Sequence, residues 1–144
     1  MKACVLYISR TGNTKRLAEA ISELLKAPVF NIADAPEPSI TQDFDVLFIG
    51  TPVMGLRPAP EVQSFVKRLP ECTRKNTILF CTYAIKQGGT LNVLEKELTP
   101  RGYITVLKVS KRGLKPGKAD FGDILNEVDK VMGELTSGAQ NTDE

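Results

Sequence analysis

The chain of 144 residues contains no histidine and only three cysteines. Without histidine it lacks the most common general base and the most common side-chain metal ligand, and it cannot form a Ser-His or Cys-His nucleophile pair. The cysteines Cys4, Cys72 and Cys81 show no CxxC spacing, which argues against a disulfide framework and against a zinc or iron–sulfur site. We therefore expect buried free thiols, no metal-binding residues and no catalytic residues.

A long apolar run is also missing near the start of the chain. Only about six apolar residues precede Ser9, too few for a signal-peptide core or a membrane span. The formal net charge is only +2, and the basic residues are not interleaved with aromatic ones, which disfavours nucleic-acid binding. We expect a cytoplasmic protein with one domain over residues 1–135, a polar, frayed tail over residues 136–144, and neither a membrane nor a nucleic acid as partner.

Short apolar runs alternate with amphipathic ones along the chain. Five runs are predicted strands: residues 3–8, 28–32, 46–49, 77–83 and 103–109. Helical spacing of apolar residues predicts helices over residues 14–25, 60–69, 91–98 and 121–135, whereas residues 33–44 show no convincing helix. Alternating strands and helices favour a parallel sheet covered by helices on both faces, so we expect a five-stranded, three-layer α/β domain.

Ligands of such folds bind beyond the carboxyl ends of the strands. The loops after the first, third and fourth strands, residues 9–14, 51–60 and 84–89, are therefore candidate binding loops. In the first, the sequence SRTGNT precedes a helix, whose free N–H groups attract anions. The hydroxyls of Ser9, Thr11 and Thr14 add donors, and Gly12 permits close approach. The pattern is neither GxxxxGK[ST] nor GxGxxG, so it favours a monophosphate over a nucleoside triphosphate or a dinucleotide. The simpler interpretation is a helix cap formed by Thr11 or Asn13.

The run VLYISRTGNTKRLAEAI, from Val5 to Ile21, resembles the signature of the flavodoxin family. The resemblance continues through DVLFIGTPVMG to about Val109, with no long insertion in the last strand. It implies a flavodoxin-like fold with strand order 2-1-3-4-5 and the cofactor FMN. The implied phosphate ligands are Ser9, Arg10, Thr11, Gly12, Asn13 and Thr14. The implied contacts of the flavin ring are Thr51, Pro52, Val53, Met54, Gly55, Thr82, Tyr83, Ala84, Lys86, Gln87, Gly88 and Gly89.

The sequence also departs from the family pattern. Many flavodoxins stack aromatic side chains on the ring, whereas here the loop tips carry Met54, Leu56 and Ile85. Many are strongly acidic near the ring, whereas here Arg57 and Lys86 occupy the ring loops, and a basic segment, residues 108–118, follows the fifth strand. Apolar aliphatic groups can still cover a flavin, without the stacking contribution of an aromatic ring.

Three functions remain open at this point. The resemblance implies an FMN-dependent electron carrier that shuttles electrons between redox proteins such as a ferredoxin or a reductase. The positive charge of Arg57 and Lys86 favours an acidic partner. The alternative is an FMN-dependent NAD(P)H:quinone-type oxidoreductase in which Arg57 or Lys86 receives a nucleotide phosphate. A third alternative is a binding module that has lost the cofactor, against which the intact first loop argues. We expect a monomer or a weak homodimer.

Overall fold

The computed structural model describes residues 1–113 and 120–142, the last four of these by their backbone alone. Five parallel strands form the central sheet in the order β2-β1-β3-β5-β6. The strands are β1 (Ala3–Tyr7), β2 (Val29–Asn31), β3 (Val46–Met54), β5 (Lys75–Tyr83) and β6 (Tyr103–Arg112), and a short antiparallel strand, β4 (Arg57–Pro58), pairs with β3. The predicted five-stranded parallel sheet and its order are confirmed.

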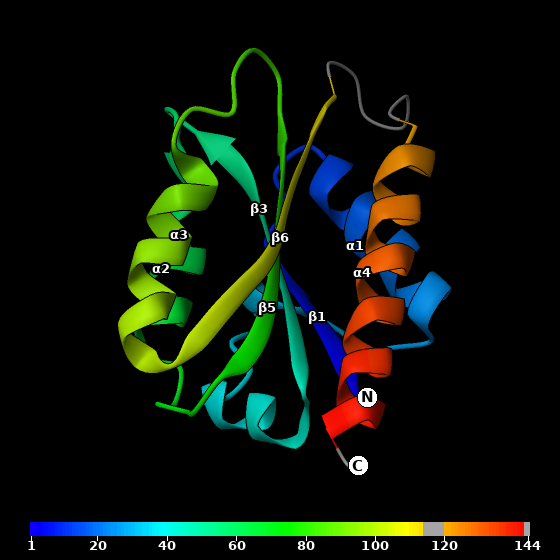
Figure 1. Ribbon diagram of the computed structural model, residues 1–144. Coiled ribbons are helices and arrows are strands. Elements are labelled where there is room, and N and C mark those ends of the chain that lie inside the picture. Colours follow the sequence, from blue (N-terminus) through cyan, green and yellow to red (C-terminus); the bar gives the residue numbers. More distant parts are fainter. Residues whose placement is uncertain (114–119, 143–144) are drawn as a thin grey trace.

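Four α-helices cover the sheet in two layers (Figure 1). They are α1 (Asn13–Leu25), α2 (Pro60–Lys67), α3 (Thr90–Leu98) and α4 (Gly122–Thr142), with three 3₁₀ helices, η1 (Ile32–Asp34), η2 (Pro38–Asp43) and η3 (Thr99–Arg101). Helices α1 and α4 lie on one face and α2 and α3 on the other. The described part of the chain therefore has the three-layer α/β architecture that the alternating sequence pattern predicts.

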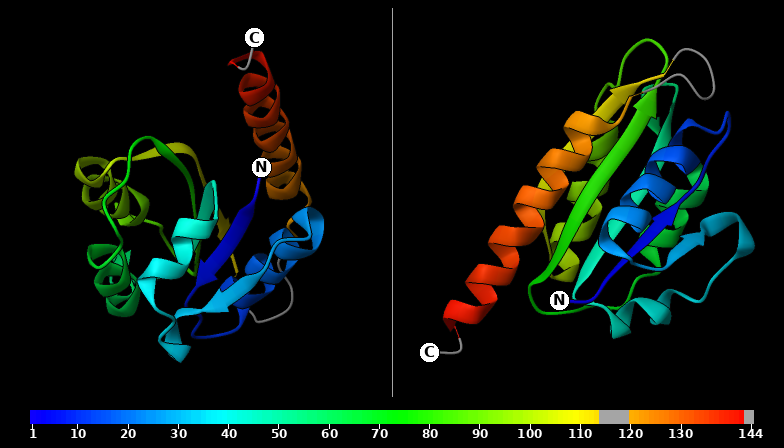
Figure 2. Two further views of the ribbon diagram at one scale, coloured as in Figure 1. Left: turned by 90° about the horizontal axis from the view of Figure 1, so that it is seen from below. Right: turned by 90° about the vertical axis from the view of Figure 1, so that its right-hand side faces the viewer.

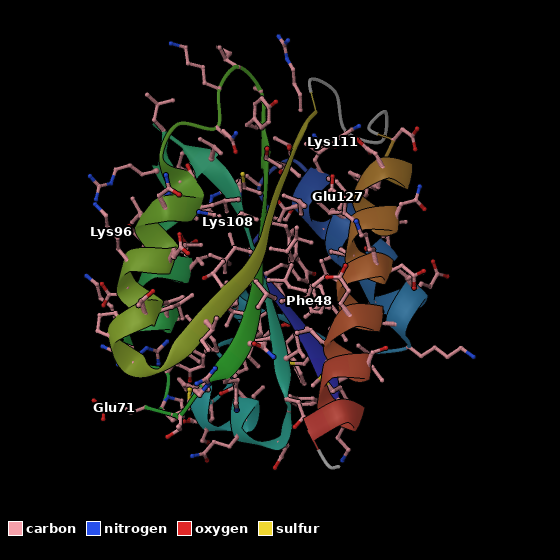
Figure 3. All side chains as sticks on the ribbon, in the orientation of Figure 1. Phe48, Glu71, Lys96, Lys108, Lys111 and Glu127 are labelled. Atoms are coloured by element: carbon pink, nitrogen blue, oxygen red, sulfur yellow. The ribbon has the colours of Figure 1, made fainter. Side chains whose placement is uncertain are left out.

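The two helical layers pack on opposite faces of the sheet, and successive apolar side chains of each inner strand point alternately to one layer and to the other. In β1, Cys4 and Leu6 pack towards α2 and α3, whereas Val5 and Tyr7 pack towards α1 and α4. Successive side chains of a strand point to opposite faces, so a strand buried on both faces reads as a continuous apolar run. Phe48 of β3 lies between the sheet and α4 (Figure 3).

Several element boundaries differ from the predicted ones. Strand β3 continues to Met54 instead of ending at residue 49, because residues 50–52 still pair with β5 and residues 53–54 pair with β4 in a hairpin. Strand β6 continues to Arg112, so the first five residues of the basic segment 108–118 belong to the sheet and residues 114–118 lie outside the described part. Residues 33–44, expected to lack an α-helix, hold η1, which starts at Ile32, and η2.

Helix α4 also exceeds its prediction. It runs to Thr142, through residues 136–142, for which the sequence predicts a frayed tail (Figure 2). Val131, Met132 and Leu135 pack against the sheet, and the hydroxyl of Thr136 donates to the carbonyl of Met132. Helix elongation adds one backbone hydrogen bond for each residue fixed, so a packed stripe supports further polar turns.

Gly50 in β3 leaves room for a buried ring. A Cβ atom at this position would lie 2.1 Å from Cε2 of Phe80, whose side chain is fully buried. We expect Gly50→Ala to lower the free energy of unfolding by about 1 to 2 kcal/mol because it overpacks the core. Gly133→Ala on exposed α4 is the control, since its Cβ would meet no atom within 4 Å, and it should raise stability by about 0.5 to 1 kcal/mol. Urea denaturation measures both, and unchanged stability of Gly50→Ala would contradict this packing.

Candidate functional site

The three predicted loops meet at the carboxyl edge of the sheet. A hollow of about 170 Å³ lies between them. Its lining residues come from the first loop, from β3, from the end of β5 and from the end of β6: Arg10, Thr11, Asn13, Pro52, Val53, Met54, Thr82, Tyr83, Ala84 and Gly113. A second hollow of about 360 Å³ shares two of these residues and is lined by Val53, Gly55, Leu56, Ala84, Ile85 and Lys86. The two together form a continuous candidate site.

The first loop, residues 9–14, is capped from within. The Oγ of Ser9 accepts hydrogen bonds from the backbone N–H groups of Gly12 at 3.2 Å and Lys15 at 3.3 Å. The cap expected from Thr11 or Asn13 is therefore supplied by Ser9. The N–H groups of Arg10, Thr11, Asn13 and Thr14 donate to no acceptor within residues 1–113 and 120–142. These four donors, at the start of α1, form a concave set that suits an anion.

Gly12 gives this loop its shape. Its φ of +96° lies in the left-handed region, and a Cβ there would meet no atom within 4 Å. The space in front of the loop is therefore open, and only the backbone conformation restricts the residue to glycine.

Asn13 joins the first loop to the end of β6. It is 3% exposed, and its Nδ2 donates to the carbonyl of Gly113 at 3.3 Å. Its Oδ1 has no hydrogen-bond partner within the described residues. Gly113 is held in turn by its N–H, which donates to the carbonyl of Tyr83. The strand that lies farthest from β1 in the sequence thus closes the site beside the anion loop.

Thr14 and Thr82 form a buried hydroxyl pair behind the loop. Their Oγ1 atoms lie 2.7 Å apart, and the residues are 1% and 6% exposed. The pair connects the first turn of α1 to the end of β5. The Thr14 hydroxyl therefore points into the protein, and the hollow is lined by Thr82 without Thr14.

The β3–β4 hairpin forms the opposite wall. Gly55 and Leu56 have φ values of +57° and +67°, as the two central residues of a type I′ turn do. At its base, the Oγ1 of Thr51 accepts from the N–H of Ala59 at 2.9 Å and donates to the carbonyl of Pro52. Thr51 is fully buried, so it shapes the hairpin from inside.

The hairpin tip touches the loop between β5 and α3. A Cβ on Gly88 would lie 2.8 Å from Cβ and 2.9 Å from the carbonyl oxygen of Leu56, and the φ of Gly88 is +57°. Gln87 and Gly88 line a separate hollow of about 220 Å³ with Lys108 and Ser110, and Gly89 caps α3. The structure thus places these three predicted residues outside the two hollows. Gly88 instead packs against Leu56 at the hairpin tip.

One ion pair spans the site. Both carboxylate oxygens of Glu61, in the first turn of α2, lie 2.6 and 2.7 Å from Nη2 of Arg10. The hydrogen bond from Arg10 lowers the pKa of Glu61 below its ordinary value. Arg10 also lines the smaller hollow. The carboxylate of Glu61 therefore neutralises the one cation of residues 9–14 at the edge of this hollow.

This ion pair leads to a testable prediction. Glu61→Gln frees the charge of Arg10, so we expect a phosphate-bearing ligand such as FMN to bind about three- to tenfold more tightly at low salt. Riboflavin, which lacks the phosphate, should bind as before. Fluorescence titration of the apoprotein with both ligands measures the change, and an equal gain for riboflavin would show that Arg10 does not face the phosphate.

Sequence reasoning missed three residues of this region: Glu61, Arg112 and Gly113. Gly113 and Arg112 follow from the strand order, because β6 is the neighbour of β5 and ends at the same edge. The Nε of Arg112 donates to the carbonyl of Ala84 at 3.0 Å. No local signal marks Glu61, since it lies 51 positions from its partner.

A further hollow lies away from this site. It measures about 820 Å³ and lies at the amino edge of the sheet, between Met1, Phe44 and the second half of α4. None of the predicted site residues lines it.

The described residues offer little support for a reactive thiol, a metal site or a membrane-spanning helix. Burial raises the pKa values of the Cys4 and Cys81 thiols to about 12, so both stay protonated at neutral pH, and Cys72 is also a free thiol. Within residues 1–113 and 120–142, no group of three or more acidic, histidine or cysteine side chains could hold a metal ion. None of the helices described has the length and apolar character needed to cross a membrane.

Comparisons with known proteins agree with the observed fold. The sequence model of the family described as "Flavodoxin domain" matches residues 4–111, which include all the predicted site residues. Oxidised flavodoxin 1 from Bacillus cereus has a TM-score of 0.74 at 20% identity, over 95% of this chain and 98% of that one. Two-electron reduced flavodoxin from Megasphaera elsdenii has a TM-score of 0.71 at 22% identity, over 81% and 90%. A flavoprotein from Lactobacillus acidophilus in complex with FMN has a TM-score of 0.58 at 18% identity, over 76% and 92%.

Proposed function

The chain belongs to the flavodoxin family, and from this premise we propose that it binds FMN and carries electrons between redox proteins. The observation that carries the proposal is the set of backbone N–H groups of Arg10, Thr11, Asn13 and Thr14, which have no acceptor in the described part of the chain. Such donors at a helix N-terminus match the oxygens of a phosphate monoester.

The remainder of the site fits the other end of the cofactor. Next to the anion loop, the two hollows offer an apolar floor of Pro52, Val53 and Ala84. These residues, with those of the hairpin and the β5–α3 loop, would hold a planar, largely apolar ring system. The L. acidophilus flavoprotein was solved with FMN, which supports the same ligand here. FMN, when bound, supplies one- and two-electron redox chemistry.

A carrier suits the site better than an autonomous enzyme. The charged residues that line the two hollows are Arg10 and Lys86, as far as the described residues go. The chain has no histidine, which is the most common general base. The protein then contributes binding and a surface from which electrons leave, and the cofactor contributes the reaction.

Titration of the apoprotein tests the proposal. FMN should bind with a perturbed flavin absorbance spectrum and more tightly than riboflavin, because the loop recognises phosphate. Loss of this preference would contradict phosphate binding by residues 9–14. The loaded protein should then oxidise NADPH only slowly with a quinone as acceptor. Rapid turnover without a second protein would instead assign the chain as an NAD(P)H:quinone oxidoreductase. Arg57 or Lys86 would then bind a phosphate of the nucleotide.

A further inference from the structure

Three large apolar side chains stand exposed around the two hollows. Ile85 is 78% exposed, Leu56 is 51% exposed and Met54 is 40% exposed. Met54 and Leu56 belong to the hairpin and Ile85 to the β5–α3 loop, and these two segments are in contact through Gly88. A cluster of this kind, contributed by two braced loops, is typical of the apolar centre of a protein interface.

Unpaired cations surround this apolar cluster. Arg57 follows Leu56 in the hairpin, Lys86 follows Ile85, and the Nε of Arg112 is tied to the carbonyl of Ala84. All three residues are exposed, and none forms an ion pair with a described residue.

Neighbouring cations differ in this respect. Arg10 pairs with Glu61, and Lys111 pairs with Asp123 at 3.3 Å. Figure 3 shows Lys111 at the upper end of β6. Positive charge is thus left uncompensated at the apolar cluster, while the cations beside it are neutralised.

We propose that this face docks an acidic redox protein. The docking face consists of Met54, Leu56, Arg57, Ile85, Lys86 and Arg112. The inference rests on the proposed function, because it places the partner where the ring edge would lie. Charge complementarity indicates an acidic partner. Its carboxylates would contact Arg57, Lys86 and Arg112, which form no ion pair with a described residue, and an apolar contact would form at the centre. A second copy of this chain would instead place like charges opposite one another.

The electron step is simple. An acidic ferredoxin serves as the probe, reduced beforehand at its [2Fe–2S] cluster. One electron leaves the cluster, which is oxidised, and enters bound FMN, which is reduced, and any proton that follows comes from water. No bond between the two proteins forms or breaks.

The decisive variant is Arg57→Glu/Lys86→Glu/Arg112→Glu. Its matched control is Lys67→Glu/Lys96→Glu/Lys130→Glu, which changes the net charge equally at exposed helix positions. Figure 3 shows Lys96 on the outer side of α3. We expect the first variant to raise the Kd for the ferredoxin in isothermal titration at least about thirtyfold at low salt, and the control less than about threefold. Equal losses would overturn the proposal, because net charge alone would then explain binding.

A second variant tests the apolar centre. Ile85→Ser should weaken ferredoxin binding about fivefold or more without changing its salt dependence, because it removes contact area and no charge. An unchanged Kd would overturn the assignment of this centre. Basic cytochrome c should bind at least about tenfold more weakly than ferredoxin, and tighter binding would overturn the acidic partner.

Two further outcomes name other occupants. Sedimentation that shows a dimer, dissociated by the triple variant, would assign the face to a second copy. Binding of a DNA oligonucleotide that is as tight as that of ferredoxin, and that Ile85→Ser leaves unchanged, would assign the face to nucleic acid and overturn the proposal. FMN titration separates these results from the proposed function. If the parent protein binds FMN but not the ferredoxin, only the partner is overturned, whereas failure of the parent protein to bind FMN overturns the function itself.

Discussion

Replacing Thr11 with aspartate should weaken FMN binding about a hundredfold, whereas replacing it with asparagine should change the affinity less than about tenfold. Thr11 is exposed and lines the smaller hollow, and its N–H has no acceptor in the described residues. A carboxylate at about 5 Å from a phosphate dianion, at an effective dielectric constant of about 40, costs roughly 3 kcal/mol. Asparagine has the same size and no charge, so the pair of variants isolates the electrostatic effect.

Riboflavin is the internal control for this experiment. It lacks the phosphate, so its affinity should be nearly the same for the parent protein and both variants. Fluorescence titration gives six affinities at each of two salt concentrations, low and moderate, and the penalty of aspartate should shrink as salt rises. Equal weakening of FMN and riboflavin by aspartate would mean that the loop does not hold the phosphate.

Removing one member of the buried hydroxyl pair should destabilise the fold. Thr14→Val or Thr82→Val leaves the other hydroxyl buried without a partner, which costs about 1 to 3 kcal/mol. The double variant replaces both hydroxyls by methyl groups of similar shape, so it should recover most of that loss. The two Oγ1 atoms lie 2.7 Å apart, close enough for strong coupling in a double-mutant cycle.

The same cycle tests the role of Thr14 in phosphate binding. Chemical denaturation of the apoprotein measures stability, and FMN titration measures affinity. Because the Thr14 hydroxyl points towards Thr82, the double variant should keep FMN affinity within about threefold of the parent. A loss of a hundredfold with normal stability would show that the hydroxyl reaches the phosphate, as the family resemblance implies.

The sequence predicts the architecture well because the relevant signals are local. Continuous apolar runs such as Val46–Ile49 mark strands buried on both faces, and the spacing of Leu91, Leu94 and Leu98 marks a helix. The strand order itself came from the resemblance to the flavodoxin family. Alternation alone does not determine which strands become neighbours, because several right-handed arrangements satisfy it.

The candidate site was predicted only in part, since much of its geometry depends on contacts between distant residues. The hairpin that extends β3 requires Leu56 at φ +67°, and leucine gives no sequence signal for a left-handed residue. The hydroxyls of the first loop look equivalent in the sequence. In the structure Ser9 caps the helix, Thr14 pairs with Thr82, and Thr11 faces the hollow. The role of Thr14 thus depends on Thr82, a partner 68 positions away in the sequence.

The contact between Gly88 and Leu56 has a kinetic consequence. Because the backbone of the β5–α3 loop packs closely against the hairpin tip, we expect the two segments to move together. A flavin ring that enters the site would therefore meet the hairpin tip and the β5–α3 loop as one coupled unit. In NMR relaxation-dispersion measurements, amides of residues 55–56 and 86–88 should share one exchange rate. Gly88→Ala adds a methyl group at this contact and pushes the two segments apart. It should therefore alter the exchange rate of both segments.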